Sequence, residues 1–154
     1  MKAISIRQPW AYAIVMGYKP VENRKARWSL RGPTWIHAGK AEDVKSFGYV
    51  FDLIADQTGA ALADVRADYH SRREGASAVG GIVGMASIID CVQGHPSKWW
   101  AGPYGLLMRD PVPLRAAVPC RGELAAFDIP DAIDERCRRN LAVMPSSSQG
   151  MLGL

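Results

Sequence analysis

The sequence lacks the long hydrophobic runs that mark membrane spans and secretory leaders. No apolar stretch approaches the roughly 18 residues that a membrane-spanning helix needs. After Lys2, the short apolar stretch 3–6 is interrupted at once by Arg7, so it is far shorter than the hydrophobic region of a signal peptide. We therefore expect an intracellular, cytoplasmic protein that does not contact a membrane.

Cysteine is scarce and follows no recognisable spacing. The three cysteines, Cys91, Cys120 and Cys137, are an odd number, which does not indicate a disulfide framework. In a reducing compartment we expect them to be small buried residues. Cys91 and His95 have the separation of half a metal site, but no second half follows at a recognisable spacing. We predict no metal site and no cofactor. A bound divalent metal ion is expected only if the chain is a nuclease.

Common nucleotide-binding and nucleophile motifs are missing too. Gly80, Gly81 and Gly84 precede an apolar segment instead of joining a strand to a helix, and they lack the Lys-Ser or Lys-Thr ending of a phosphate-binding loop. The Gly-x-Ser-x-Gly elbow of α/β-hydrolases is absent. We interpret these glycines as structural.

What is present indicates one globular domain. The chain has 154 residues, 48% of them hydrophobic, which is enough to bury a core. Its net charge of +4 is compatible with a nucleic-acid partner but does not require one. No repeat or linker divides residues 1–139. The segment 140–154 has no periodicity, and we predict a flexible tail there.

The hydrophobic pattern predicts short strands with few helices. Strands are expected at 4–7, 21–24, 33–38, 82–89, 104–109 and 123–129. Helices are expected from Trp10 to about Gly17 and over 41–58, 61–73 and 132–139. Pro111 and Pro113 are expected to end the strand that begins at 104. Because strands and helices do not alternate, we predict an α+β, mostly β fold: a mixed barrel of five to six strands with an early helix and a two-helix insertion at about 41–75.

Three charged residues follow the early helix closely. Gly17 is placed to end that helix, and Lys19, Glu22 and Arg24 come directly after it. If 21–24 is a strand, Glu22 and Arg24 point to the same side. An exposed ion pair would contribute little. Charged residues crowded behind a helix anchored by Trp10 instead predict a functional cleft, in which a lysine near a glutamate can contact phosphate or act as nucleophile or proton relay.

A histidine and a group of aromatic residues leave alternatives open. Trp35 and His37 share one face of the strand 33–38, where a core or rim histidine is the default and a general base the alternative. Trp99, Trp100 and Tyr104 are either platforms for stacking bases or plugs of a small barrel.

Several of these segments together resemble the ASCH domain family, named for homology to activating signal cointegrator 1. The resemblance is carried by Ser-Ile-Arg-Gln-Pro-Trp-Ala at 5–11, by Gly17-x-Lys19-x-x-Glu22-Asn23-Arg24, and by Arg31-Gly32-Pro33 leading into Ile-His-Ala at 36–38. Gly-Pro-Tyr-Gly at 102–105 and Arg-Gly-Glu-Leu at 121–124 are similar to the same family. The resemblance spans about residues 3–130.

The resemblance implies a PUA-like β-barrel whose cleft, between the barrel and the first helix, binds RNA or another nucleic acid. The family's charged cleft residues correspond to Lys19, Glu22 and Arg24. The leading prediction is therefore a module that binds single-stranded RNA or a modified nucleotide. Its predicted ligand-binding residues are Gln8, Trp10, Lys19, Glu22, Arg24, His37 and Tyr104.

The resemblance also implies an enzymatic alternative. One branch of the family removes acyl groups from modified cytidine with a lysine and a threonine three residues apart and a glutamate. Here Glu22 stands where that threonine would follow Lys19, so the nucleophile of that branch is missing. Other members have been linked to RNA cleavage. The alternative is a small hydrolase, either a ribonuclease or a modified-nucleoside amidohydrolase, with Lys19 and Glu22 as catalytic residues.

Overall fold

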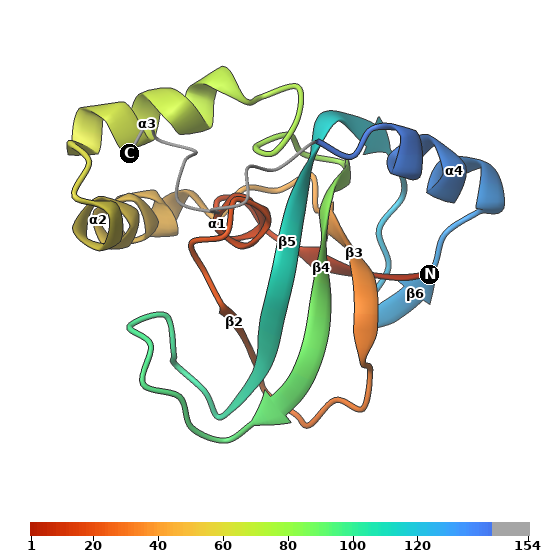
Figure 1. The fold of residues 1–154 in the computed structure, drawn as a ribbon, viewed down its shortest axis with the longest axis horizontal. Helices are drawn as coiled ribbons and strands as arrows, with labels where there is room; N and C mark the ends of the chain where they lie inside the picture. Colours follow the sequence, from red (N-terminus) through yellow and green to blue (C-terminus); the bar gives the residue numbers. More distant parts are fainter. Residues whose placement is uncertain (143–154) are drawn as a thin grey trace.

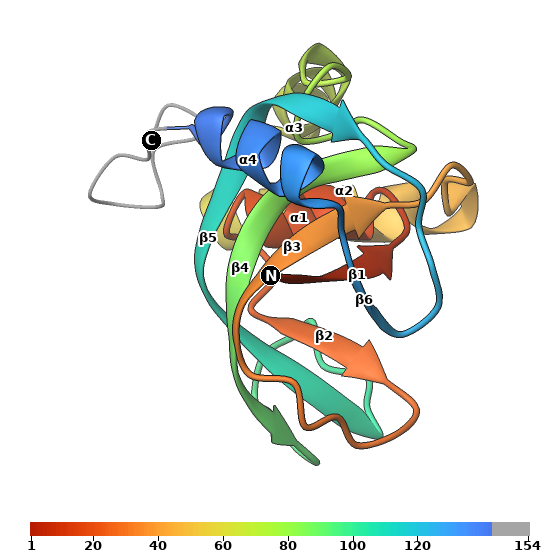
Figure 2. The same ribbon diagram turned by 90° about the vertical axis from the view of Figure 1, so that its right-hand side faces the viewer.

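The computed structural model describes residues 1–142 (Figure 1). Its strands are β1 (Lys2–Ile6), β2 (Val21–Arg24), β3 (Gly32–Ala38), β4 (Gly81–Val92), β5 (Tyr104–Pro119) and β6 (Ala126–Asp128). They form one six-stranded sheet in the order β2-β5-β4-β3-β1-β6. β1 and β3 are parallel, and the other neighbouring strands are antiparallel. The sheet curls into a half-barrel, which the turned view makes visible (Figure 2).

Helices cover both faces of the sheet. They are α1 (Trp10–Val15), α2 (Phe47–Thr58), which follows a short 3-10 turn (Val44–Ser46), α3 (Leu62–Ser71) and α4 (Asp131–Arg139). α1 packs on β3, β4 and β5, and α2 packs against α1 and α3. α4 packs on β5. Ile36 belongs to the cluster that contains α1, and its neighbour Trp35 belongs to the cluster that contains Cys137 of α4. Because successive strand residues point to opposite faces, α4 lies on the face of the sheet opposite α1.

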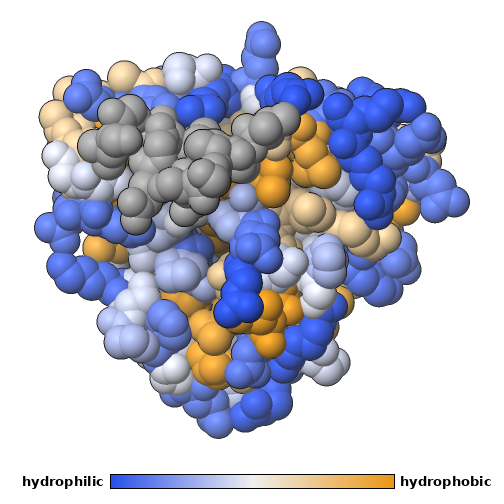
Figure 3. Space-filling model, viewed as in Figure 1, coloured by the Kyte–Doolittle hydropathy of each residue, from blue (hydrophilic) through white to orange (hydrophobic). Residues whose placement is uncertain are grey.

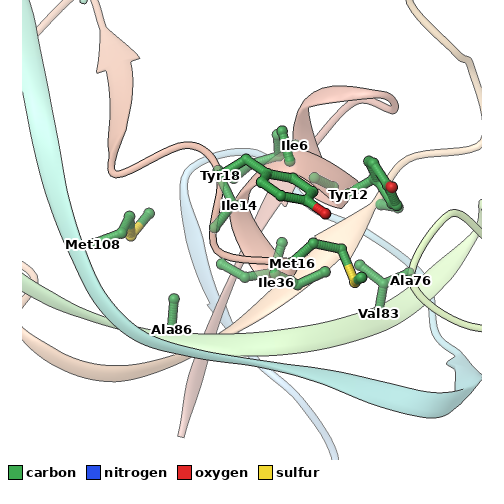
Figure 4. Close-up of a cluster of buried hydrophobic side chains, with 14 of the residues drawn as sticks. Ile6, Tyr12, Ile14, Met16, Tyr18, Ile36, Ala76, Val83, Ala86 and Met108 are labelled. Carbon is green, nitrogen blue, oxygen red and sulfur yellow. The ribbon is translucent and has the colours of Figure 1, made fainter. Parts of the chain in front are cut away.

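The larger hydrophobic cluster lies between α1 and the curved sheet. Met16, directly after α1, lies close to Ile36 of β3 and Val83 of β4 (Figure 4), and all three are buried. The smaller cluster joins Trp35 to residues of β4, β5, β6 and α4. β2 is one edge of the sheet, β1 lies next to the other edge strand, β6, and both β2 and β1 contribute residues to the site described below.

The observed architecture confirms the predicted class. The chain folds as α+β, with a mixed curled sheet, an early helix and a two-helix insertion between β3 and β4. Its surface is mainly hydrophilic on the face seen in Figure 3, with hydrophobic residues gathered below the centre. Among the described residues, no helix combines the length and the hydrophobicity that a membrane crossing requires.

The predicted end of the strand at Pro111 is wrong, because β5 continues to Pro119. Arg109 and Val112 pair with Ser87 and Met85, so Asp110 and Pro111 stand opposite a single residue as a β-bulge. Pro113 directs its carbonyl away from β4, toward the backbone N–H of Ala142 at 3.0 Å. The N–H that Pro113 lacks would point the same way, so Pro113 removes no ladder bond to β4, and Pro111 lies within the bulge, outside the paired residues.

Three other boundaries differ from expectation. The insertion does not begin as a helix at Ala41, because Glu42 and Asp43 use their carboxylates in side-chain contacts and α2 starts only at Phe47. β6 is shorter than the strand expected over 123–129. Of the predicted tail, residues 140–142 pair with β5, and residues 143–154 lie outside the described part of the chain.

Candidate nucleic-acid interface

A buried ion triad occupies the opening between α1 and β2. Gly17, with a φ of 86°, ends α1 and turns the chain so that Lys19 points inward. Lys19 Nζ lies 2.6 Å from Glu22 Oε1, and Glu22 Oε2 lies 3.2 Å from Arg24 Nη2. The side chains of Lys19, Glu22 and Arg24 are 1%, 12% and 21% exposed. The triad is therefore largely withdrawn from water.

Each cation of the triad also lies over an indole ring. Lys19 Nζ is 5.5 Å from the ring centroid of Trp10, and the guanidinium carbon of Arg24 is 4.8 Å from that of Trp28. The Trp10 ring is held in turn, since its Nε1 donates to Asp43 Oδ2 at 3.0 Å. These contacts orient both cations.

The triad lies in a cleft of about 620 Å³, called here the triad cleft. It is lined by Ser5, Ile6, Arg7, Trp10, Lys19, Glu22, Asn23, Arg24, Lys25, Asp43 and Ala101. Its cations, Arg7, Lys19, Arg24 and Lys25, outnumber its carboxylates, Glu22 and Asp43, so its net charge is positive. A positive, partly aromatic cleft suits an anionic ligand with a ring system.

Asn23 fixes the loop that forms one wall of the triad cleft. Its Oδ1 accepts from the backbone N–H groups of Ala101 and Gly102, and its Nδ2 donates to the carbonyl of Trp99. Trp99 is only 5% exposed and packs edge-on against Trp10 at 6.3 Å. Its contacts favour the plug interpretation over an open stacking platform.

Three predicted ligand-binding residues, Gln8, Tyr104 and His37, do not line the triad cleft, and His37 is described below. Gln8 is fully buried, its Nε2 donates to the carbonyls of Ala76 and Ala78, and its Oε1 accepts from the N–H of Tyr12. Tyr104 is half-buried, with the guanidinium of Arg27 5.2 Å from its ring. Trp10, Lys19, Glu22 and Arg24 are the predicted residues that the fold brings together.

Sequence reasoning missed two cations that line the triad cleft. Arg7 and Lys25 are both exposed there. Arg7 was expected at the end of the strand 4–7 and directly follows β1, but no pattern near it showed which element it would face. Lys25 follows the triad directly and carried no separate signal.

Comparison with known proteins identifies the family. Residues 4–117 match the family model described as the ASCH domain. The chain belongs to the ASCH domain family. No curated protein matches the chain.

Solved ASCH structures share the fold of this domain. The crystal structure of ASCH from Zymomonas mobilis is 14% identical, with a TM-score of 0.51, and the match covers 92% of this chain and 95% of that one. A serine-to-alanine mutant of the same Zymomonas mobilis protein is 15% identical, with a TM-score of 0.51 and coverage of 92% and 96%. At these identities the likeness shows the fold alone.

His37 lies in a second hollow of the ASCH domain, of about 690 Å³, called here the His37 hollow. It faces Ser5 across the parallel pair β1 and β3. Its Nε2 is 2.7 Å from the carbonyl of Cys120, so this nitrogen carries the proton, and Nδ1 accepts from Ser5 Oγ at 2.9 Å. With both nitrogens occupied, the contacts favour a rim histidine over a general base. Burial lowers the pKa of His37.

We expect His37 to make the ASCH domain less stable in mild acid. Because burial depresses its folded-state pKa below the unfolded value of 6.5, the unfolded chain takes up a proton that the folded chain does not. Stability should therefore fall as pH drops below that value, by at most about 1.4 kcal/mol between about pH 7.5 and 5.5. Urea unfolding of wild type and His37→Gln at both pH values measures this, and an equal loss in the two proteins would contradict it.

No metal centre accompanies the cleft in the part of the chain that the structure describes. Within residues 1–142, no group of three or more His, Cys, Asp and Glu side chains is placed to hold a metal ion. Cys91 and Cys137 are buried as expected, whereas Cys120 is only half-buried because it lines the His37 hollow. Burial raises the pKa of the Cys137 thiol to about 12, which keeps it protonated.

Proposed function

We propose that this ASCH domain binds single-stranded RNA or a modified nucleotide in the triad cleft. The observation that carries the proposal is the state of Lys19. Its ammonium group is almost fully buried in the wall of the cleft, yet among the described residues it donates only one hydrogen bond, to Glu22. An ammonium group can donate three, so two N–H groups are available to an anionic oxygen.

The surroundings of Lys19 support a phosphate-containing ligand. Arg7 and Lys25 are exposed at the mouth of the cleft and attract a polyanion from solution. Trp10 is only half-buried and leaves part of its indole accessible for a base. Glu22 holds Lys19 and Arg24 on its two oxygens, so the cations are positioned before a ligand arrives.

The test is binding of a fluorescent single-stranded RNA of about 15 nucleotides, followed by anisotropy at about 50 and 200 mM salt. We expect affinity to fall with salt and to fall about tenfold or more in Lys19→Met, since a hydrogen bond to a charged group contributes about 1.5–3 kcal/mol. Lys98→Met is the matched control, because Lys98 is exposed and pairs with Asp56 outside the triad cleft. Salt-independent binding, or equal losses in both variants, would contradict the proposal.

A hydrolase acting in the same cleft is the second candidate. The 2.6 Å contact between Lys19 and Glu22 favours it, because a proton can pass between these groups while Lys19 stabilises charge on a phosphate. End-labelled RNA and acylated cytidine are the substrates to incubate with wild type and Glu22→Gln. Product from wild type but not from the variant supports an enzyme, and RNA binding without product leaves the binding module.

A further inference from the structure

We propose that the ligand of this domain is a polynucleotide that extends beyond the triad cleft, over at least about three nucleotides, into a hollow on either side. One is the His37 hollow, whose other lining includes Lys40 and residues 120–124. The other, called here the Trp28 hollow, is lined by Asn23, Arg24, Lys25, Ala26, Trp28 and Gly102. This inference rests on the binding function proposed above and specifies its ligand class.

The three hollows adjoin in a row. Ser5 lines both the triad cleft and the His37 hollow. Asn23, Arg24 and Lys25 line both the triad cleft and the Trp28 hollow. The row therefore runs from β3, across the end of β1, to the end of β2 and the segment that follows it. A chain molecule can follow this course without leaving the surface.

The size of each hollow matches one unit of such a chain. Their volumes are about 690, 620 and 530 Å³ for the His37 hollow, the triad cleft and the Trp28 hollow. Pockets for small molecules measure about 300–1,000 Å³, so each hollow holds one nucleotide-sized group. A free nucleoside or mononucleotide would fill the triad cleft and leave both flanking hollows empty.

The charges repeat along the row as a polyanion requires. Lys40 and Arg121 are exposed in the His37 hollow, where Glu123 is the opposing carboxylate. The Trp28 hollow shares Arg24 and Lys25 with the triad cleft and has no carboxylate in its lining. A mononucleotide offers its phosphate to one position only, whereas successive phosphates of a single strand can meet cations in all of them.

The His37 hollow also has the surfaces that a base needs. His37 and Ser5 satisfy each other and the carbonyl of Cys120, which leaves an uncharged wall of fixed shape. Gly122 lies so close that a Cβ there would be 2.4 Å from His37 Cε1, so the loop follows this wall tightly. Leu124, at the rim, is 96% exposed and offers apolar area to a base plane.

The test varies the length of the ligand and, separately, removes two cations of the His37 hollow. Three proteins are titrated with uridine monophosphate, a dinucleotide and a hexanucleotide. They are wild type, the double variant Lys40→Met/Arg121→Met and the control double variant Arg66→Met/Lys98→Met. Both double variants lose the same charge, but the control residues lie outside the three hollows. We expect wild type to bind the hexanucleotide at least about tenfold more tightly than the monophosphate. The first variant should lose the part of that gain that the His37 hollow supplies, while keeping its affinity for the monophosphate. Its salt slope should fall by about 0.7 for each phosphate that the variant no longer neutralises.

The outcomes separate this inference from the function on which it rests. Equal affinity for all lengths, with monophosphate binding that still needs Lys19, overturns the extended ligand and leaves the triad cleft as a nucleotide site. Equal losses in the two double variants overturn it as well, because net charge alone would then explain the effect. Failure of every ligand to bind wild type overturns the proposed function itself.

Discussion

Replacing Glu22 by alanine is expected to lower the free energy of unfolding by about 3–5 kcal/mol, because it breaks a buried ion pair from one side. Glu22 accepts from Lys19 at 2.6 Å and from Arg24 at 3.2 Å. Without it, the Lys19 ammonium, only 1% exposed, would lie beside an indole with no counter-charge. Urea denaturation at neutral pH, followed by circular dichroism, measures the loss.

Two further variants show whether burial is the cause. Asp128→Ala breaks the Lys2–Asp128 pair, whose partners are 46% and 78% exposed, and should cost less than about 1 kcal/mol. The double variant Lys19→Met/Glu22→Ala should recover most of the loss, since no unpaired charge then remains buried at Lys19. A Glu22→Ala loss no larger than that of Asp128→Ala would show that the triad is open to water.

The same reasoning separates stability from function at Lys19. Lys19→Met leaves Glu22 paired with Arg24 at 3.2 Å, so no buried charge loses its last partner, and the variant should fold about as well as wild type. The binding proposed for the triad cleft should nevertheless weaken in that variant. Lys19 is thus a residue whose burial is hard to explain by stability, and this is the strongest physical argument that the cleft has a ligand.

The local part of the site could be predicted from the sequence. Gly17 marked the end of α1, and the period of two along β2 placed Glu22 and Arg24 on the same side. Both inferences depend on neighbours within a few residues, which backbone geometry alone determines. The structure agrees, since both side chains belong to one triad.

Contacts between distant segments could not be predicted in this way. Asp43 lies where a helix was expected to begin, but its carboxylate accepts from the Trp10 indole, 33 positions earlier in the chain. The course of β5 past Pro111 depended on a bulge and on which edge of the strand is free, and these are properties of the assembled sheet. His37 was correctly placed on the same strand face as Trp35, yet its hydrogen-bond partner, the carbonyl of Cys120, lies 83 positions further along the chain.

Gln8→Ala is expected to lower the free energy of unfolding by about 3 kcal/mol or more, because three buried backbone groups lose their partner at about 1–3 kcal/mol each. The side chain is fully buried and joins the start of α1 to the carbonyls of Ala76 and Ala78, in the segment that leads into β4. Gln93→Ala, at an exposed position, is the matched control and should change stability by less than about 0.5 kcal/mol.

RNA affinity of the same variant decides what Gln8 does in this domain. Its sequence context, directly before Pro9 and Trp10, predicts a ligand-binding residue, whereas its contacts leave no polar atom directed into the triad cleft. Measured under conditions where Gln8→Ala remains folded, affinity should therefore match wild type within about twofold, a difference of about 0.4 kcal/mol. A tenfold loss in the folded variant would contradict the structural role and return Gln8 to the ligand site. Unchanged affinity together with lost stability would show that the Gln-Pro-Trp turn serves the cleft through Trp10, while Gln8 holds the turn in place.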